Sequence, residues 1–361
     1  LWSRGLGDVY KRQVSFDLNS LYPHLIMQYN ISPETYVRHI GQRPTADEII
    51  AGLFDNQNIK DFMKKHNVSV CGSGAMYTKD FQGFLPKLME KMYNERVKWK
   101  GQMIEAKKQY QKSKTKKLEY EIAKCNNMQM AKKIQLNSAY GALGNQYFRF
   151  FDTKYAESIT LSGQLSIKWM EVKLNMFLNE KLNTKDVDYV VAVDTDSLYV
   201  VLDKAVEESG IDQNDTDKVI NFLDKLSNQL LEPYIDKSYK QLADYVGAFE
   251  QKMVMKRENI ADKAIWTGKK HYIMNVYDSE GVRYEEPKLK MMGIESVRSS
   301  TPGVVRKAIK EALDVLMKDG EMALREYVND FETLFRQMPF EDVAFPRGCR
   351  YINKWSSASD I

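Results

Sequence analysis

Apolar positions along the chain follow two different spacings, which predicts an α+β fold. From residue 83 to about 124 they recur at intervals of three and four, as on one face of a helix, and residues 118–141 and 155–182 continue that pattern. Residues 14–18 alternate apolar and polar side chains, and residues 187–202 place apolar runs on both sides of an acidic turn. These spacings predict a strand and a hairpin among long helices.

The same pattern predicts how further elements follow one another. Residues 109–117 are rich in lysine and have almost no apolar side chain, so we expect an exposed turn between two long antiparallel helices. Residues 215–243 predict a helix. Residues 249–258 and 264–286 predict strands, with a turn at 278–281.

The two ends of the chain give different signals. Thr301 is expected to cap a helix that has Pro302 at its first position and ends near Gly320, with another helix to about Arg336. Residues 1–13 show no clear period. We expect them to be a junction that does not belong to the native fold.

Composition narrows the class of protein. The 361 residues are 43% hydrophobic and 28% charged, as in globular proteins, and no apolar run approaches a membrane span, so no membrane partner is expected. The three cysteines are widely spaced and predict neither a disulfide framework nor a zinc site, which favours a reducing cytoplasm. The four histidines are scattered, so oxygen ligands are expected for any metal.

Positive charge is concentrated in one part of the chain. The net charge is only +4, but residues 96–133 contain many lysines and few acids. Such an imbalance favours a polyanionic partner. The alternative for residues 107–117 is an ordinary solvated helical face.

Two acidic segments lie far apart in sequence, and each places a carboxylate at the end of an apolar run. Asp17 follows the alternating strand, and Asp194 and Asp196 lie in the turn of the predicted hairpin. A buried carboxylate needs a partner, and two neighbouring carboxylates repel each other without a cation. Each segment alone also fits an ordinary polar turn, but together they predict a site for divalent metal ions and phosphoryl chemistry.

A third segment has an unusual helical face. Lys133, Asn137, Tyr140, Gly141 and Gly144 fall on one stripe, where a core helix would be apolar. The cation and the amide suit phosphate, whereas the aromatic ring and the bare backbone suit a flat base pair. A glycine-broken helix with a solvated lysine is the alternative.

A basic pair precedes this stripe. Arg96 and Lys100 are four residues apart and share a helical face, so antiparallel packing of the two helices would bring them to Lys133 and Asn137. A solvated surface pair is the alternative interpretation of this spacing.

In chain order, the Asp17 segment, the Lys133 segment and the Asp194–Asp196 segment resemble motifs A, B and C of the family B (α-like) DNA polymerases. Lys269-Lys270-His271-Tyr272 resembles that family's Lys-Lys-Arg-Tyr motif, and residues 286–293 and 299–302 look most like the branch from T-even-type bacteriophages. The matching residues are Asp17-Leu18-x-Ser20-Leu21-Tyr22-Pro23, Lys133-x-x-x-Asn137-Ser138-x-Tyr140-Gly141 and Asp194-Thr195-Asp196-Ser197.

The resemblance implies a polymerase architecture of the α+β class and a reaction. A palm with an antiparallel sheet and packed helices would comprise residues 14–82 and 142–295. A two-helix antiparallel fingers insertion would comprise residues 83–141, and a partial helical thumb residues 296–361. The implied reaction is template-directed transfer of a nucleotide from a dNTP to a primer 3′-OH, assisted by two Mg2+ ions, for which Mn2+ could substitute.

The resemblance also implies roles at the matching positions. Asp17 and Asp196 would bind both metal ions, with Asp194 as a weaker ligand, and Leu18 would offer its carbonyl oxygen. Ser20 and Leu21 would give backbone amides to the triphosphate. The side chains expected to hold the triphosphate are Arg96, Lys100, Lys133 and Asn137, with Lys133 also a proton donor to the leaving pyrophosphate.

Other matching positions would face the sugar, the base pair and the duplex. Tyr22 would lie under the incoming sugar and exclude a ribose 2′-OH. Tyr140 and Gly141 would border the nascent base pair. The residues expected to contact primer–template DNA are Lys269, Lys270, Tyr272 and Arg298.

The sequence departs from the family pattern in places. His271 replaces the usual arginine and His24 a usual serine. Relatives begin with an N-terminal domain and a 3′–5′ exonuclease domain, so we expect this chain to be a fragment lacking those domains and a complete thumb. A sliding clamp and replisome proteins would be partners of the full-length parent, in the cytoplasm of a phage-infected bacterial cell.

Two other functions compete with DNA synthesis. A reverse transcriptase or viral RNA polymerase shares palm carboxylates, but usually has adjacent aspartates in the hairpin, where Thr195 intervenes here, and Tyr22 favours dNTPs. A non-catalytic nucleic-acid-binding remnant is the other possibility. The presence of the carboxylates and phosphate-binding residues opposes that second interpretation, and the truncation favours it.

Overall fold

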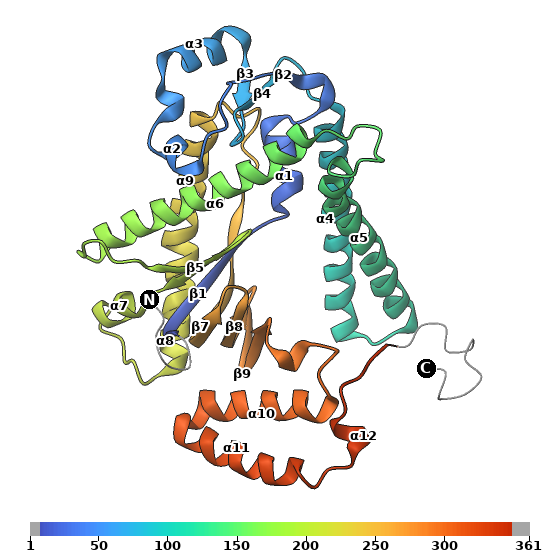
Figure 1. The fold of residues 1–361 in the computed structure, drawn as a ribbon, viewed down its shortest axis with the longest axis vertical. Coiled ribbons are helices and arrows are strands. Elements are labelled where there is room, and N and C mark those ends of the chain that lie inside the picture. Colours follow the sequence, from blue (N-terminus) through green and yellow to red (C-terminus); the bar gives the residue numbers. More distant parts are fainter. Residues whose placement is uncertain (1–7, 349–361) are drawn as a thin grey trace. The chain divides into compact units, whose positions relative to one another are not determined.

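The computed structural model describes residues 8–348, apart from the side chains of residues 8, 9, 111 and 112. Helices and antiparallel strands occur in separate runs along the chain, which confirms the α+β class (Figure 1). The chain divides into two compact units. The larger unit contains residues 15–200 and 221–258, and the smaller unit contains residues 8–14, 201–220 and 259–348 of the part that the structure describes. No helix in this part is long and apolar enough to cross a bilayer.

Six strands form one sheet, in the order β5-β6-β1-β7-β8-β9, and the chain passes from one unit to the other within β1 and within β7. The predicted hairpin at 187–202 is confirmed as β5 and β6, which pair antiparallel. The β7–β8 and β8–β9 pairs are also antiparallel. The strands are β1 (Asp8–Leu18), β5 (Val190–Asp194), β6 (Ser197–Val201), β7 (Met255–Gly268), β8 (His271–Ser279) and β9 (Val282–Met292).

Strand β1 begins six residues before the predicted start at Val14. Its polar residues, which hid the strand period, have partners within the smaller unit: Arg12 lies 3.9 Å from the Asp203 carboxylate, and Gln13 accepts a hydrogen bond from Trp266 Nε1 at 3.2 Å. The expected start of the first strand at Val14 is therefore wrong, whereas the expectation that residues 1–13 form a junction stays a prediction. Residues 1–7 lie outside the described residues.

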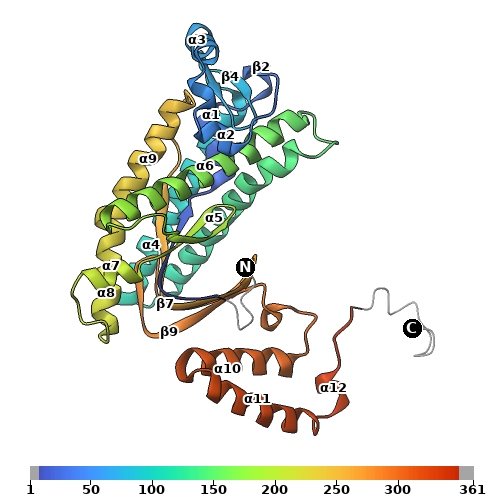
Figure 2. The same cartoon turned by 60° about the vertical axis from the view of Figure 1, so that its left-hand side comes forward.

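Two long helices, α4 (Phe84–Lys112) and α5 (Lys116–Leu143), lie side by side in both views and confirm the predicted antiparallel pair (Figures 1 and 2). The turn between them is only residues 113–115, so the expected turn at 109–117 is too long. Lysine is a good helix former, which lets both helices run into the lysine-rich stretch. Thr115 Oγ1 caps α5 by accepting from the Leu118 N–H.

The core of the larger unit forms around α1 (Leu21–Tyr29) and α6 (Thr153–Lys181), which confirms the helix predicted at 155–182. Helix α1 packs against α4, α5 and α6. Fully buried side chains on α1 include Leu25, Ile26 and Tyr29. This packing fixes the position of the chain that follows β1.

A second, three-stranded sheet, β2-β4-β3, was not predicted from the mixed pattern of residues 40–80. Its turn packs on α6: the Gly72 N–H donates to Ser162 Oγ at 3.0 Å, and Ser73 Oγ lies 3.1 Å from Ser158 Oγ. The sheet and the helices beside it are β2 (Tyr36–His39), β3 (Val68–Val70), β4 (Ala75–Thr78), α2 (Ala46–Ile50) and α3 (Gln57–His66).

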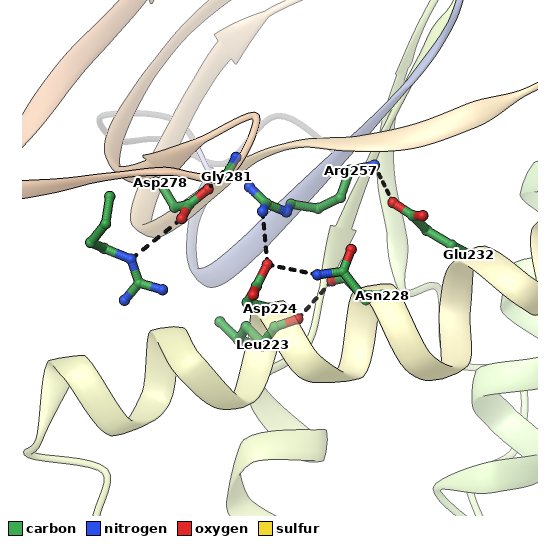
Figure 3. A network of polar contacts seen from close by, with 9 residues as sticks. Leu223, Asp224, Asn228, Glu232, Arg257, Asp278 and Gly281 are labelled. Carbon is green, nitrogen blue, oxygen red and sulfur yellow. Dashed lines mark hydrogen bonds and ion pairs between the residues drawn. The ribbon is translucent and has the colours of Figure 1, made fainter. Parts of the chain in front are cut away.

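The helix predicted at 215–243 is interrupted. A π-helical segment, Ser227–Leu231, separates α8 (Thr216–Leu226) from α9 (Glu232–Tyr245). Within the larger unit, Arg257 ties these helices to β7: its Nη2 donates to Asp224 at 2.7 Å, and its N–H donates to Glu232 at 3.0 Å (Figure 3). Of the strand expected at 249–258, only the last four residues belong to β7, which begins at Met255.

The smaller unit contains β8, β9 and the C-terminal helices. The predicted turn at 278–281 is confirmed, with the Gly281 N–H donating to the Asp278 carboxylate at 3.0 Å (Figure 3). Pro302, not Thr301, is the N-cap residue of α10, so the predicted Thr301 cap is wrong. The helices are α7 (Asp203–Glu208), α10 (Gly303–Asp319), α11 (Glu321–Phe335) and α12 (Phe340–Val343). Residues 349–361 of the expected partial thumb lie outside the described residues.

Candidate active site

The end of β1 and the β5–β6 turn meet in the larger unit. The Leu18 N–H donates to the Asp196 carbonyl oxygen at 2.8 Å, and Ser197 Oγ donates to Asp17 Oδ2 at 2.8 Å. Asp194 pairs with Ser197 across the hairpin, so Thr195 and Asp196 form the turn itself, with Thr195 at a φ of 48°. The two acidic segments, which are about 180 residues apart in sequence, are thus brought together.

The donor atoms at this junction are hard oxygens. Asp17, Asp194 and Asp196 are all half-buried, and the Leu18 carbonyl lies on the same strand end. Among residues 8–348, no three His, Cys, Asp or Glu side chains form a ready-made metal cluster. Mg2+ usually takes only one or two carboxylates and fills its other positions with water and substrate phosphates, so this donor set fits that ion.

Helix α1 begins at Leu21, separated by two residues from the end of β1 at Leu18. Its N-cap residue Ser20 has left-handed backbone angles, φ 50° and ψ 56°, and its side chain makes no capping hydrogen bond. The first N–H groups of a helix have no partner inside the helix, and the helix dipole favours an anion there. Ser20, Leu21 and Tyr22 therefore form a turn that suits a phosphate group.

Side chains on α4 and α1 form hydrogen bonds with this turn. Arg96 Nη1 donates to Ser20 Oγ at 3.2 Å, and Asn19 Nδ2 donates to the Tyr93 hydroxyl oxygen at 2.6 Å. His24 Nδ1 lies 2.9 Å from the Ser20 carbonyl oxygen. From its spacing Arg96 was expected beside Lys133 and Asn137, and its contact with Ser20 was not predicted. Asn19, Tyr93 and His24 were missed because an isolated amide, phenol or imidazole has no motif signal.

The aromatic residues of the first and second motifs also meet. The rings of Tyr22 and Tyr140 lie 4.7 Å apart, centroid to centroid. Helix α5 is continuous to Leu143, so Lys133, Asn137 and Tyr140 do share one face, as predicted. Lys100, Lys133 and Asn137 are exposed on their helices, and the contacts that fix Arg96 and Tyr140 do not include them.

The four residues expected to contact DNA lie in the smaller unit. Lys269 and Lys270 form the turn between β7 and β8, with Lys270 at a φ of 62°. Tyr272 is only 2% exposed, and its ring lies 4.4 Å from that of Trp266, so it supports the hairpin and presents little surface to a ligand. Arg298 is paired with Glu295 at 3.6 Å.

A comparison with known proteins identifies the family. The profile of DNA polymerase family B matches residues 7–345. The chain belongs to this family. It is 35% identical to the DNA-directed DNA polymerase of Escherichia phage RB69 over 96% of this chain and 43% of that protein, and 34% identical to that of Enterobacteria phage T4 over 95% and 43%. DNA polymerase 1 of Pyrococcus abyssi is 26% identical over 86% of this chain and 30% of that protein.

The family B chain therefore resembles the T-even phage polymerases along almost its whole length, as the motifs predicted. It spans less than half the length of these curated relatives.

His24 gives this family B chain a testable pH dependence. Burial lowers the pKa of His24, with Lys252 and Arg96 acting in the same direction and the bond to Ser20 opposing them. Below about pH 6.5 the unfolded chain binds a proton at His24 that the folded chain does not bind. The free energy of unfolding should therefore decrease as the pH decreases, by at most about 1.4 kcal/mol per pH unit. Urea unfolding of wild type and His24→Ser at about pH 5.5 and about pH 7.5 measures this. An identical pH dependence in both would contradict the expectation.

Proposed function

We propose that this chain carries the nucleotidyl-transfer centre of a template-directed DNA polymerase. The observation that carries the proposal is the junction of the two acidic segments, with the Leu18 N–H on the Asp196 carbonyl oxygen at 2.8 Å and Ser197 Oγ on Asp17 at 2.8 Å. Oxygen ligands beside a phosphate-binding helix start suit metal-assisted attack on a nucleoside triphosphate.

The reaction is attack of the primer 3′-OH oxygen on the α-phosphorus of a dNTP. The 3′-OH loses its proton to solvent as a new O–P bond forms, the bond to the β-phosphate bridging oxygen breaks, and pyrophosphate leaves. Two Mg2+ ions, held by Asp17, Asp196, the Leu18 carbonyl and more weakly Asp194, would lower the pKa of the 3′-OH and stabilise charge on the leaving group. Mn2+ would serve as a substitute.

The other residues bind and orient the nucleotide. The amides of Ser20 and Leu21 would bind the triphosphate, with the side chains of Arg96 and Lys100 adding positive charge. Lys133 would donate a proton to the leaving pyrophosphate, and Asn137 would hold a phosphate oxygen. Tyr140 and Gly141 would border the nascent base pair.

Primer–template DNA is the proposed macromolecular partner. Lys269 and Lys270, in the turn between β7 and β8, would contact backbone phosphates of the DNA. The buried Tyr272 would support that turn, and Arg298 would add a further contact. The α4–α5 pair would be the fingers, residues 14–82 and 142–295 the palm, and the chain from residue 296 part of a thumb. A sliding clamp and replisome proteins would join a longer parent protein in the bacterial cytoplasm.

Primer extension by the whole chain tests the proposal. The chain is incubated with a labelled primer–template, Mg2+ and either dNTPs or rNTPs. The proposal expects template-directed extension with dNTPs and little with rNTPs. Strong extension with rNTPs would favour an RNA polymerase. Salt-dependent DNA binding without any extension would favour a non-catalytic remnant.

Tyr22 gives a prediction about sugar selection. Its ring packs on Tyr140 at 4.7 Å and would lie under the sugar, so removing it should admit a 2′-OH. We expect Tyr22→Ala to raise the use of rNTPs relative to dNTPs by roughly 10- to 200-fold, the range of a steric pocket contact. Tyr22→Phe keeps the ring and should remain selective. Competitive incorporation assays measure the ratio, and equal selectivity of the alanine and phenylalanine variants would contradict this role.

A further inference from the structure

A closed cycle of contacts joins Ser20, Asn19, Tyr93 and His24 around the turn that starts helix α1. Ser20 Oγ donates to Asn19 Oδ1 at 3.4 Å, and Asn19 Nδ2 donates to the Tyr93 hydroxyl oxygen at 2.6 Å. The Tyr93 ring meets the His24 ring edge-on, with centroids 4.6 Å apart and an interplanar angle of 83°. His24 Nδ1 then returns to the Ser20 carbonyl oxygen at 2.9 Å.

The Ser20 carbonyl oxygen accepts two hydrogen bonds in this cycle of contacts. It accepts the helical bond from the His24 N–H at 3.2 Å as well as the bond from His24 Nδ1. Because a carbonyl accepts, the nearby ring nitrogen of the neutral imidazole must carry the hydrogen. Both donors come from His24, so one residue fixes the orientation of the peptide unit between Ser20 and Leu21.

That peptide unit needs such support. Ser20 has left-handed backbone angles, which a residue with a Cβ adopts only when its surroundings hold it there. The same unit supplies the Leu21 N–H, the first donor of the helix start. A rotation of this unit would turn that donor away from a bound phosphate, whereas the rest of α1 is fixed by its buried face.

We infer that His24 is a positioning residue for nucleotide binding: it locks the Ser20–Leu21 peptide unit so that its amide meets the triphosphate of the incoming dNTP. The inference rests on the proposed function. His24 is only 5% exposed and lies behind the turn, so it acts through Ser20 and does not touch the nucleotide itself. Tyr93 and Arg96 attach the same turn to α4. The direction of the backbone amides in the turn therefore depends on the position of α4.

Two substitutions separate positioning from mere packing. Serine inside a helix can donate to the carbonyl four residues back, so His24→Ser keeps the bond to the Ser20 carbonyl but loses the ring. His24→Ala loses both. His66→Ala is the matched control, because His66 is an exposed histidine at the end of α3.

The experiment is steady-state and single-turnover primer extension with varied dNTP, on the whole chain. We expect His24→Ala to raise the KM for dNTP about 10-fold, the loss of one hydrogen bond and its orientation, with kcat and primer–template affinity within about 2-fold of wild type. His24→Ser should restore most of the KM, and His66→Ala should match wild type.

The outcomes distinguish this inference from the proposed function. An unchanged KM in His24→Ala, with an active wild-type chain, overturns the inference alone. Equal KM increases in His24→Ser and His24→Ala also overturn it, because the ring and not the bond to Ser20 would then matter. A wild-type chain that neither extends a primer nor binds Mg2+–dNTP in an equilibrium titration overturns both.

Discussion

Asp17→Asn should reduce the rate of primer extension by about 10³-fold, or about 4 kcal/mol in activation free energy. The amide is neutral and a poor ligand for Mg2+, so the attacking and leaving oxygens would lose their stabilisation. The fold should survive, because the amide oxygen can still accept the hydrogen bond that Ser197 Oγ now donates to Asp17 at 2.8 Å. Single-turnover extension measures the loss, and thermal unfolding checks that the variant is folded.

Asp186→Asn is the matched control for this change. Asp186 is exposed, precedes β5 and has a φ of 56°, a backbone conformation that asparagine adopts readily. The same chemical substitution there should leave extension at the wild-type rate. If Asp17→Asn also extended at the wild-type rate, Asp17 would not be a metal ligand.

Gly72→Ala should destabilise the folded chain by about 3 kcal/mol. A Cβ at this position would lie 2.5 Å from the Leu161 carbonyl oxygen and 2.8 Å from the Ser162 nitrogen. Both are backbone atoms of α6, so no side-chain rotation can relieve the clash, and the bond from the Gly72 N–H to Ser162 Oγ would be strained. Thermal unfolding of the chain should show a midpoint lower by roughly 4 °C, because the unfolding entropy grows with chain length.

Gly101→Ala makes the same chemical change with the opposite expected sign. Gly101 lies within α4, and nothing is within 4 Å of a Cβ built there. Alanine should stabilise the helix by about 0.5–1 kcal/mol. Stability of Gly72→Ala equal to that of wild type would mean that the β3–β4 turn does not pack on α6 as described.

The sequence predicted the elements whose pattern was strong. The α4–α5 pair, α6 and the β5–β6 hairpin were expected because their apolar spacing extends over many residues. Strand β1 was expected only from Val14, because residues 8–13 do not alternate apolar and polar side chains. Arg12 in this segment pairs with the distant Asp203, which local spacing cannot reveal. The small β2-β4-β3 sheet was missed for a similar reason: its strands are short, and the turn between β3 and β4 is held by the distant helix α6.

The candidate site was predictable where several functional groups share a short motif. Asp17 and the Asp194–Asp196 turn carry enough chemistry to be linked from their residue types and spacing, and their junction agrees with that link. The supports of the site carry no such signal. His24 contacts the Ser20 carbonyl oxygen, and Tyr93 contacts the Asn19 side-chain amide. No pattern of single residues predicts such contacts.

A double-variant cycle tests most directly whether the two acidic segments form one centre. Single-turnover primer extension is measured for wild type, Asp17→Asn, Asp196→Asn and the combined variant, with the chain in excess over primer–template. If both carboxylates hold the same ions, the combined variant should be about as slow as the slower single variant, because the first loss already removes the shared stabilisation. Multiplied losses in the combined variant, or wild-type rates in either single variant, would contradict a shared centre.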